Sequence, residues 1–202
     1  QSSLQGLSST WPAPLDKPAR MQLPLTVSQQ WEPQSEDTAQ LALGLGDLLE
    51  AQYRVRSTEG RPLSPLSGRV RLGPKPVAAV ALGNAPRAAV WEIQWPRLDV
   101  GEWQQAVDEV FPSPARGGTS VSISPWWPQR LRLDVRELKL ANRWWQAVQL
   151  LATQQGAGWT FNLKGQAFDG VGQFTPAQPP ATARLSMDFQ RLAIPEALPE
   201  PT

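Results

Sequence analysis

Cysteine and histidine are both absent from the 202 residues of the sequence. Their absence excludes thiol nucleophiles, Ser-His-Asp triads, structural zinc sites and transition metals held by histidine. We therefore expect no metal, no cofactor and no enzymatic activity. The lack of cysteine is compatible with any redox compartment, because neither disulfides nor free thiols are at stake.

An excess of charge of one sign is also missing. Lysine and arginine together number 19 and the acidic residues number 18, so no basic field is present to attract a nucleic acid. The sequence has no apolar run of transmembrane length and no signal peptide at its start. We expect the chain to be a fragment of a longer protein, with any membrane contact made by parts outside the fragment.

One pattern of apolar residues occurs three times, at positions i, i+2, i+4, i+7 and i+9. The three copies are Trp91, Ile93, Trp95, Leu98, Val100; Leu131, Leu133, Val135, Leu138, Leu140; and Leu185, Met187, Phe189, Leu192, Ile194. A period of two is typical of strands with one apolar face. The single three-residue step in each copy requires a β-bulge or a sharp bend if the apolar residues are to stay on that face.

The remaining sequence predicts further strands and one helix. Alternating residues over 41–55, interrupted by Gly46-Asp47, predict a hairpin, and Gly170 and Gly172 are interpreted with Gly156, Gly158 and Gly165 as turns and bulges. The helix is predicted at 99–111, with Asp99 and Glu102 resembling a capping box and Trp103 on its apolar stripe. The predicted fold is mainly β: an antiparallel, twisted or curved sheet that forms a groove, with one amphipathic helix packed against it.

Proline and glycine at 112–118 predict the division of the chain. Residues 1–112 form an N-terminal β subdivision that ends in the helix, and residues 119–195 form a C-terminal β subdivision. Residues 196–202 carry several prolines and are predicted to be a disordered tail.

Several features have more than one interpretation from the residues alone. The apolar stripe can be an ordinary core or the lining of a groove, and the pairs Trp126-Trp127 and Trp144-Trp145 can be packing residues or a carbohydrate platform. Acidic pairs such as Asp134 and Glu137 could act as a general acid and base, but they are predicted on a solvated face with ordinary pKa values. Three function classes follow: a lipid-conducting groove, a non-catalytic scaffold or interaction module, and a carbohydrate hydrolase.

Short motifs along the chain resemble the YhdP family of AsmA-like proteins. They are Ser3-Leu4-Gln5-Gly6-Leu7, Pro12-Ala13-Pro14-Leu15, Lys17-Pro18, Gly68-Arg69-Val70-Arg71-Leu72-Gly73, Leu98-Asp99-Val100, Glu102-Trp103, Leu131-Arg132-Leu133-Asp134-Val135, Gly158-Trp159, Ala183-Arg184-Leu185 and Arg191-Leu192. The similarity depends on the order of these motifs, which covers nearly the whole chain. Trp11 stands where the family more often has an aliphatic residue.

The resemblance implies a segment of a bridge-like lipid-transport protein, anchored in the inner membrane and located in the periplasm of a Gram-negative bacterium. The resemblance implies that such a protein carries phospholipid toward the outer membrane along a hydrophobic groove of stacked strands, supporting the outer-membrane permeability barrier. The expected partners are phospholipid acyl chains and other envelope proteins. The residues expected to line the groove are Trp91, Ile93, Trp95, Leu131, Leu133, Val135, Leu185, Met187 and Phe189.

Overall fold

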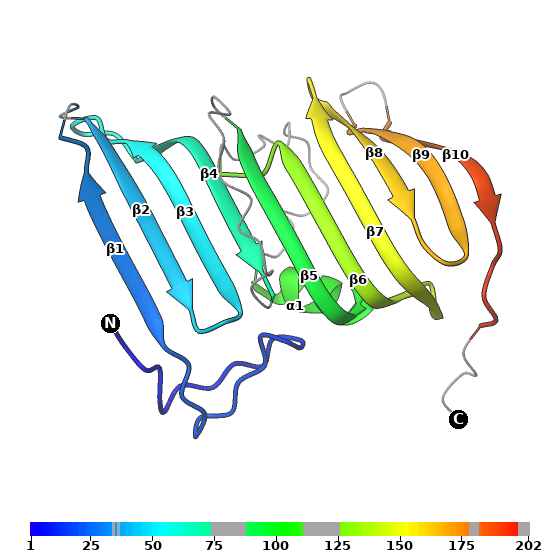
Figure 1. Ribbon diagram of the computed structural model, residues 1–202, viewed down its shortest axis with the longest axis horizontal. Coiled ribbons are helices and arrows are strands. Elements are labelled where there is room, and N and C mark those ends of the chain that lie inside the picture. The colour runs from blue at the N-terminus through cyan, green and yellow to red at the C-terminus, as the bar shows by residue number, and fades with distance from the viewer. Residues whose placement is uncertain (34, 36, 74–87, 111–125, 178–181, 198–202) are drawn as a thin grey trace.

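The computed structural model describes residues 1–33, 35, 37–73, 88–110, 126–177 and 182–197. Within them the chain forms one sheet of ten strands and one helix (Figure 1). The elements are β1 (Leu25–Trp31), β2 (Thr38–Leu45), β3 (Leu49–Arg56), β4 (Ser64–Leu72), β5 (Ala89–Asp99), α1 (Val100–Val110), β6 (Arg130–Leu140), β7 (Arg143–Gln155), β8 (Gly158–Lys164), β9 (Phe168–Thr175) and β10 (Arg184–Leu192). The predicted mainly β fold with one helix is confirmed, and so is the hairpin of β2 and β3.

The strands lie in the sheet in the same order as in the chain, from β1 to β10. Neighbours pair antiparallel except at β4–β5 and β5–β6, which are parallel. A parallel pair needs a crossover connection, and the second crossover begins with α1. The predicted boundary at 112–118 and the end of the tail, 198–202, lie outside the described residues. The strands before and after that boundary, β5 and β6, are neighbours in one continuous sheet.

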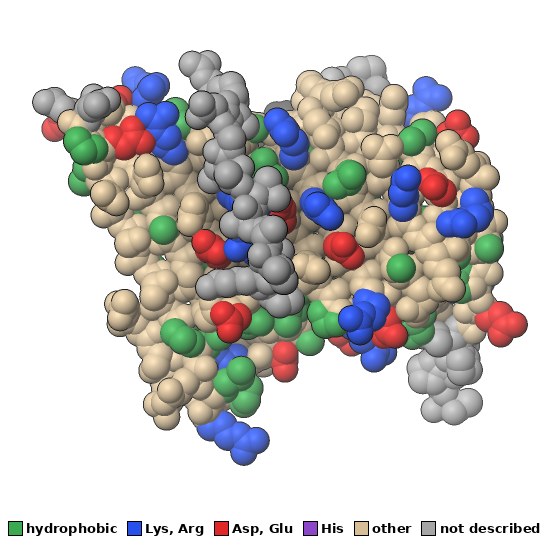
Figure 2. Space-filling model, in the orientation of Figure 1, with side chains coloured by type: hydrophobic (Ala, Val, Ile, Leu, Met, Phe, Trp, Pro, Cys, Tyr) green, Lys and Arg blue, Asp and Glu red, His purple; other side chains and the backbone are tan. Residues whose placement is uncertain are grey.

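The register of the sheet brings apolar residues from all ten strands onto one face. One row across the sheet is Val27, Leu43, Ala51, Val70, Trp91, Leu131, Ala152, Phe161, Gly172 and Met187; the next is Leu25, Leu45, Leu49, Leu72, Ile93, Leu133, Leu150, Leu163, Gly170 and Phe189. Residues between them point to the opposite face, which Figure 2 shows with many charged side chains and few apolar ones. The sheet therefore has one apolar face and one polar face.

The three-residue step has two structural forms. In the third copy, the pairing of β10 with β9 shifts by one residue between Phe189 and Arg191, which is a bulge. In the first two copies, β5 and β6 stay in register on both sides of the step, so the two strands bend together. The predicted bulge or bend is confirmed in both forms. In β7, Ala147 lies beside this bend and has a φ of 53°, in the left-handed region.

The bend places a hydrophobic core at one end of the sheet. Val135, Leu138, Val148 and Phe168 are buried there, and Leu98, Val100, Leu133, Trp145, Leu163, Ala167 and Phe189 pack around them. The rings of Trp145 and Phe168 lie 5.3 Å apart, and the amide N–H of Gln166 donates to the carbonyl of Gln146 at 3.0 Å. These contacts join β7 to the connection between β8 and β9.

Helix α1 begins where its sequence predicts, directly after Asp99. The Asp99 carboxylate accepts hydrogen bonds from the backbone N–H groups of Gly101 and Glu102, at 2.9 and 3.3 Å, which makes Asp99 the N-cap. The helix lies on the apolar face, where Trp103 stacks on Trp95 with 5.0 Å between ring centroids. Phe111, the last residue predicted for the helix, lies outside the described residues.

Gly170 and Gly172, which are interpreted as turns or bulges, both lie inside β9. Gly170 pairs with Phe189 at the bulge of β10, whereas the prediction is wrong for Gly172, which pairs regularly with Met187. A Cβ atom at Gly172 would lie 2.5 Å from the Phe161 ring and 2.8 Å from the Met187 sulfur. Glycine is needed at position 172 because the side chains of Phe161 in β8 and Met187 in β10 lie across the backbone of β9.

The N-terminal segment, residues 1–20, folds around a buried lysine. The Lys17 ammonium donates to the carbonyls of Leu4 and Leu7 at 2.8 and 2.7 Å, and the side chain is almost inaccessible. Trp11 from this segment contacts the edge of Trp103, with ring centroids 5.7 Å apart. The segment is therefore fixed to the helix as well as to β1, where Ser2 pairs with Leu25.

We predict that Trp103→Ala lowers the free energy of unfolding by about 3 kcal/mol, because it removes the ring held between Trp95 and Trp11. Urea denaturation followed by circular dichroism measures the free energy of unfolding of the wild-type and variant proteins. The control is Gln104→Ala, an exposed neighbour on the same helix, which should change stability by less than about 0.5 kcal/mol. Equal effects of the two substitutions would show that Trp103 does not hold the helix on the sheet.

A second prediction concerns pH and the N-cap. Burial alone would raise the pKa of Asp99, but hydrogen bonds from Lys139 and from the amides of Glu102 and Gly101 outweigh it, so this pKa is lowered. A lowered folded-state pKa gives a stabilisation that is complete above the unfolded value and is lost as the pH falls through the folded value. Asp99→Ala should therefore cost about 1 kcal/mol at pH 7 and less below about pH 4.

Urea denaturation of both proteins at pH 7, 5 and 3 checks this dependence. Asp99→Asn keeps an oxygen that accepts the capping hydrogen bonds but has no charge. The difference in stability between Asp99→Asn and Asp99→Ala should therefore stay constant with pH. A difference between wild type and Asp99→Ala that does not change from pH 7 to pH 3 would contradict the role of the charge.

Candidate functional site

The apolar face is hollowed over β6–β10 into a groove of about 820 Å³, which we call the apolar groove. Its lining consists of aliphatic, aromatic and proline side chains: Trp127, Pro128, Leu131, Leu138, Leu140, Trp145, Val148, Leu150, Ala152, Ala157, Trp159, Phe161, Leu163, Phe168, Phe174, Pro176, Leu185, Met187, Phe189 and Leu192. A cavity without polar groups cannot orient a polar ligand by hydrogen bonds. Its chemistry suits hydrocarbon.

The end of the groove at the bend is partly closed by the chain itself, and the lining residues Leu140 and Leu192 remain 47% and 49% exposed there. The hairpin of β6 and β7 turns back there, so that Trp145 packs on Phe168 at 5.3 Å. The Arg143 guanidinium donates to the carbonyl of Pro195, beyond β10. The apolar groove therefore ends against the buried core described above.

The opposite end of the groove is open. Trp127, Phe174 and Leu185 lie there with 57%, 38% and 63% of their surface exposed. Exposed apolar side chains that are contiguous, rather than scattered, mark a binding surface more often than an ordinary surface. An apolar ligand placed here would remove them from water.

An aromatic cluster forms the wall of the groove on the β5 side. Trp91 stacks on Trp127 with 5.9 Å between centroids, and its indole N–H donates to the Tyr53 hydroxyl at 3.1 Å. The Tyr53 hydroxyl donates in turn to the carbonyl of Trp126 at 3.2 Å. A Cβ atom at Gly68 would lie 2.2 Å from the Tyr53 ring, so only glycine leaves room for it. The wall is thus fixed by hydrogen bonds as well as by stacking.

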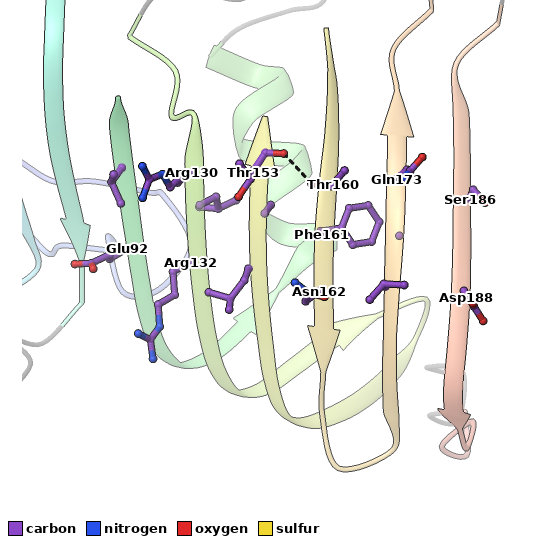
Figure 3. Close-up of a pocket in the computed structure, with 16 residues that line it drawn as sticks. Glu92, Arg130, Arg132, Thr153, Thr160, Phe161, Asn162, Gln173, Ser186 and Asp188 are labelled. Carbon is purple, nitrogen blue, oxygen red and sulfur yellow. Dashed lines mark hydrogen bonds between the residues drawn. The ribbon is translucent and has the colours of Figure 1, made fainter. Parts of the chain in front are cut away.

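The polar face carries ion pairs between neighbouring strands. Arg69 pairs with Glu92 at 2.6 Å, and Arg71 pairs with Glu50 at 2.8 Å. A second hollow of about 720 Å³ lies on this face, and Figure 3 shows that its labelled residues are mostly polar or charged. It offers no continuous apolar surface, so hydrocarbon is suited to the other face.

The acidic pairs considered for catalysis lie away from the apolar groove. Asp134 lies between Gln94 and Gln149 of the neighbouring strands, Glu137 lies between Arg97 and Gln146, and neither lines the groove. The described residues contain no group of three or more acidic side chains placed to hold a metal ion. In the same part of the chain, no helix has the length and apolar character to cross a bilayer.

The nine residues predicted to bind lipid share one face, but they have different surroundings. Leu131, Leu185, Met187 and Phe189 line the apolar groove. Leu133 and Val135 belong to the core at the bend, and Val135 is completely buried. Trp91 forms the aromatic wall, Trp95 is buried under Trp103, and Ile93 lies in register between Leu72 and Leu133. Their contact with lipid stays a prediction.

Much of the groove lining comes from outside the three copies. Trp159, Phe161 and Leu163 in β8 alternate as the apolar residues of a strand do, but they lie outside the three copies of the pattern. In β9, Phe168, Gly170, Gly172 and Phe174 alternate in the same way once glycine is counted as apolar. In the two tryptophan pairs, Trp127 and Trp145 line the groove, Trp126 packs against Tyr53 with 5.1 Å between ring centroids, and Trp144 lies under the Arg97 guanidinium at 4.1 Å.

Comparison with known proteins gives one match. The family model described as YhdP protein matches residues 1–202. No curated protein and no solved structure matches the chain. The family match covers every residue from which the groove, the wall and the helix are built, so the chain belongs to the YhdP protein family.

Proposed function

We propose that this chain is a segment of a bridge-like, AsmA-like lipid-transport protein that is anchored in the inner membrane. In this proposal it lies in the periplasm of a Gram-negative bacterium and carries phospholipid between the inner and outer membranes. The supporting observation is the apolar groove, which is open to solvent on a face that is apolar across all ten strands. Membership of the YhdP family supports a role in the cell envelope.

The size and chemistry of the groove favour acyl chains over other ligands. Burial of apolar surface contributes roughly 25 cal/mol per Å², or about 0.8 kcal/mol for each methylene group. An acyl chain gains this free energy of burial along its whole length and needs no hydrogen bond. A sugar or a peptide would leave its polar groups unpaired against these residues, which costs free energy.

A non-catalytic scaffold is the alternative function, and one observation favours it. Strand β1 is an edge of the sheet, and its seven residues include no charged residue and no proline. Natural edge strands commonly carry such residues to prevent pairing with another chain. A strand from an envelope protein could therefore add to β1.

A photo-crosslinking experiment tests the lipid proposal. A benzophenone amino acid replaces Leu150 or Met187, which line the groove, in protein expressed in a bacterial envelope. Mass spectrometry after irradiation should detect phospholipid adducts at both positions. The matched controls are the adjacent Leu151 and Asp188, which are exposed on the polar face.

Adducts confined to Leu150 and Met187 would support conduction along the apolar face. Equal labelling of Leu151 would instead indicate non-specific contact with membrane, because Leu151 is apolar but faces the other way. Folded protein without adducts at any of the four positions would contradict the lipid proposal. The scaffold would then be the better account of the chain.

A further inference from the structure

Helix α1 rests on the sheet through few of its side chains. Val100, its first residue, packs in the core at the bend, and Trp103 stacks on Trp95 of β5 with 5.0 Å between ring centroids. The exposed residues of the helix are Gly101, Glu102, Gln104, Gln105 and Glu109. Much of the helix therefore faces water, and an aromatic stack holds it over the bend end of β5 (Figure 1).

The N-terminal segment also contacts the Trp103 ring. Trp11 meets it edge-on with 5.7 Å between centroids, and the Trp103 indole N–H donates to the carbonyl of Ala13 at 3.3 Å. Ala13 lies 90 residues before Trp103 in the chain, so the position of α1 depends on a distant segment. An aromatic contact and one hydrogen bond each contribute modestly to stability. The helix is therefore held in place by interactions that a competing ligand could replace.

The ring beneath the helix buries an unpaired polar group. Trp95 is 6% exposed, and its indole N–H has no hydrogen-bond acceptor among the residues that the structure describes. A buried donor without an acceptor costs free energy, which contact with water or with a ligand oxygen would recover. The covered state of Trp95 therefore carries a cost that uncovering the ring removes.

Gly101 lies between the anchored start of the helix and Trp103. On the anchored side, Val100 packs in the core and the Asp99 carboxylate pairs with Lys139 at 2.7 Å. Gly101 has no side chain to restrict rotation of the backbone, and hinge residues are often small and lie at the ends of elements. The rest of α1 can therefore rotate about Gly101 while Asp99 and Val100 stay in place.

We propose that α1 is a lid over β5, hinged at Gly101 and latched shut by Trp11, and that a hydrocarbon ligand opens it. Trp95 lies in register with Val135 of β6, which lies in register with Val148 of the groove lining. Opening the lid extends the apolar surface beside the groove to Trp95, so an acyl chain buries more surface in the open state. A ligand shifts a conformational equilibrium toward the state that it binds better. This inference rests on the proposed function and adds a conformational step to it.

Amide hydrogen exchange followed by mass spectrometry tests the opening. Purified protein is compared before and after it is loaded with dioleoylphosphatidylcholine from vesicles, and extraction of the lipid establishes the loading. Exchange at residues 102–110 should become about fivefold faster in the loaded protein, which is the change expected when an aromatic contact worth about 1 kcal/mol is lost. Exchange in the hairpin of β2 and β3 should not rise.

The latch is tested by Trp11→Ala, which removes the ring in contact with Trp103. Without lipid, this variant should exchange residues 102–110 about fivefold faster than wild type, and it should take up the lipid faster. The matched control is Leu7→Ala, which changes a residue of the same segment that is 62% exposed. The control should leave both rates unchanged.

The outcomes separate this inference from the proposed function. Loaded protein in which exchange at residues 102–110 is unchanged or slower would overturn the lid and leave a groove that binds lipid. Equal effects of Trp11→Ala and Leu7→Ala would overturn the latch. Folded wild-type protein that takes up no lipid would overturn the proposed function together with the lid. Circular dichroism of each variant establishes that faster exchange does not reflect loss of the fold.

Discussion

The register of the sheet is the constraint on which the rest of the structure depends. Because side chains alternate between faces, a slip of one residue in any strand would move its apolar set to the polar side. Ten strands in succession nevertheless keep two apolar rows aligned, from Val27 to Met187 and from Leu25 to Phe189. On the other face, the pairs Arg69–Glu92 and Arg71–Glu50 hold β3, β4 and β5 in the same register.

An apolar face of this extent needs either a cover or a ligand. The bend supplies a cover for part of it, because β6 and β7 turn back and bury Val135, Val148 and Phe168. Helix α1 covers a second part through Trp103. The rest is left open as the groove, so the same bend that builds the core also bounds the candidate site on one side. Stability and function therefore share these residues.

The sequence predicts local features well and non-local ones poorly. The N-cap Asp99, the stripe residue Trp103 and the steps in the three copies follow from spacing within one segment. The parallel pairing of β5 with its two neighbours depends on crossovers that leave no periodic signal. The prediction is wrong for Gly172 because glycine contributes space rather than a side chain, and that space matters only beside Phe161 and Met187. The lining from β8 and β9 is not predicted because it lies outside the three copies of the pattern.

The aromatic wall determines whether the groove can continue across β5. The apolar rows extend beyond it to β1, but the described groove stops at Trp91 and Trp127. Trp91 is fixed by its hydrogen bond to Tyr53, which is itself held by Trp126 and seated over Gly68. Trp127 is 57% exposed and is held within the described residues by stacking on Trp91. A stack is weaker than a hydrogen-bonded ring in a close-packed seat, so Trp127 is held less firmly than Trp91 at the boundary between the two parts of the face.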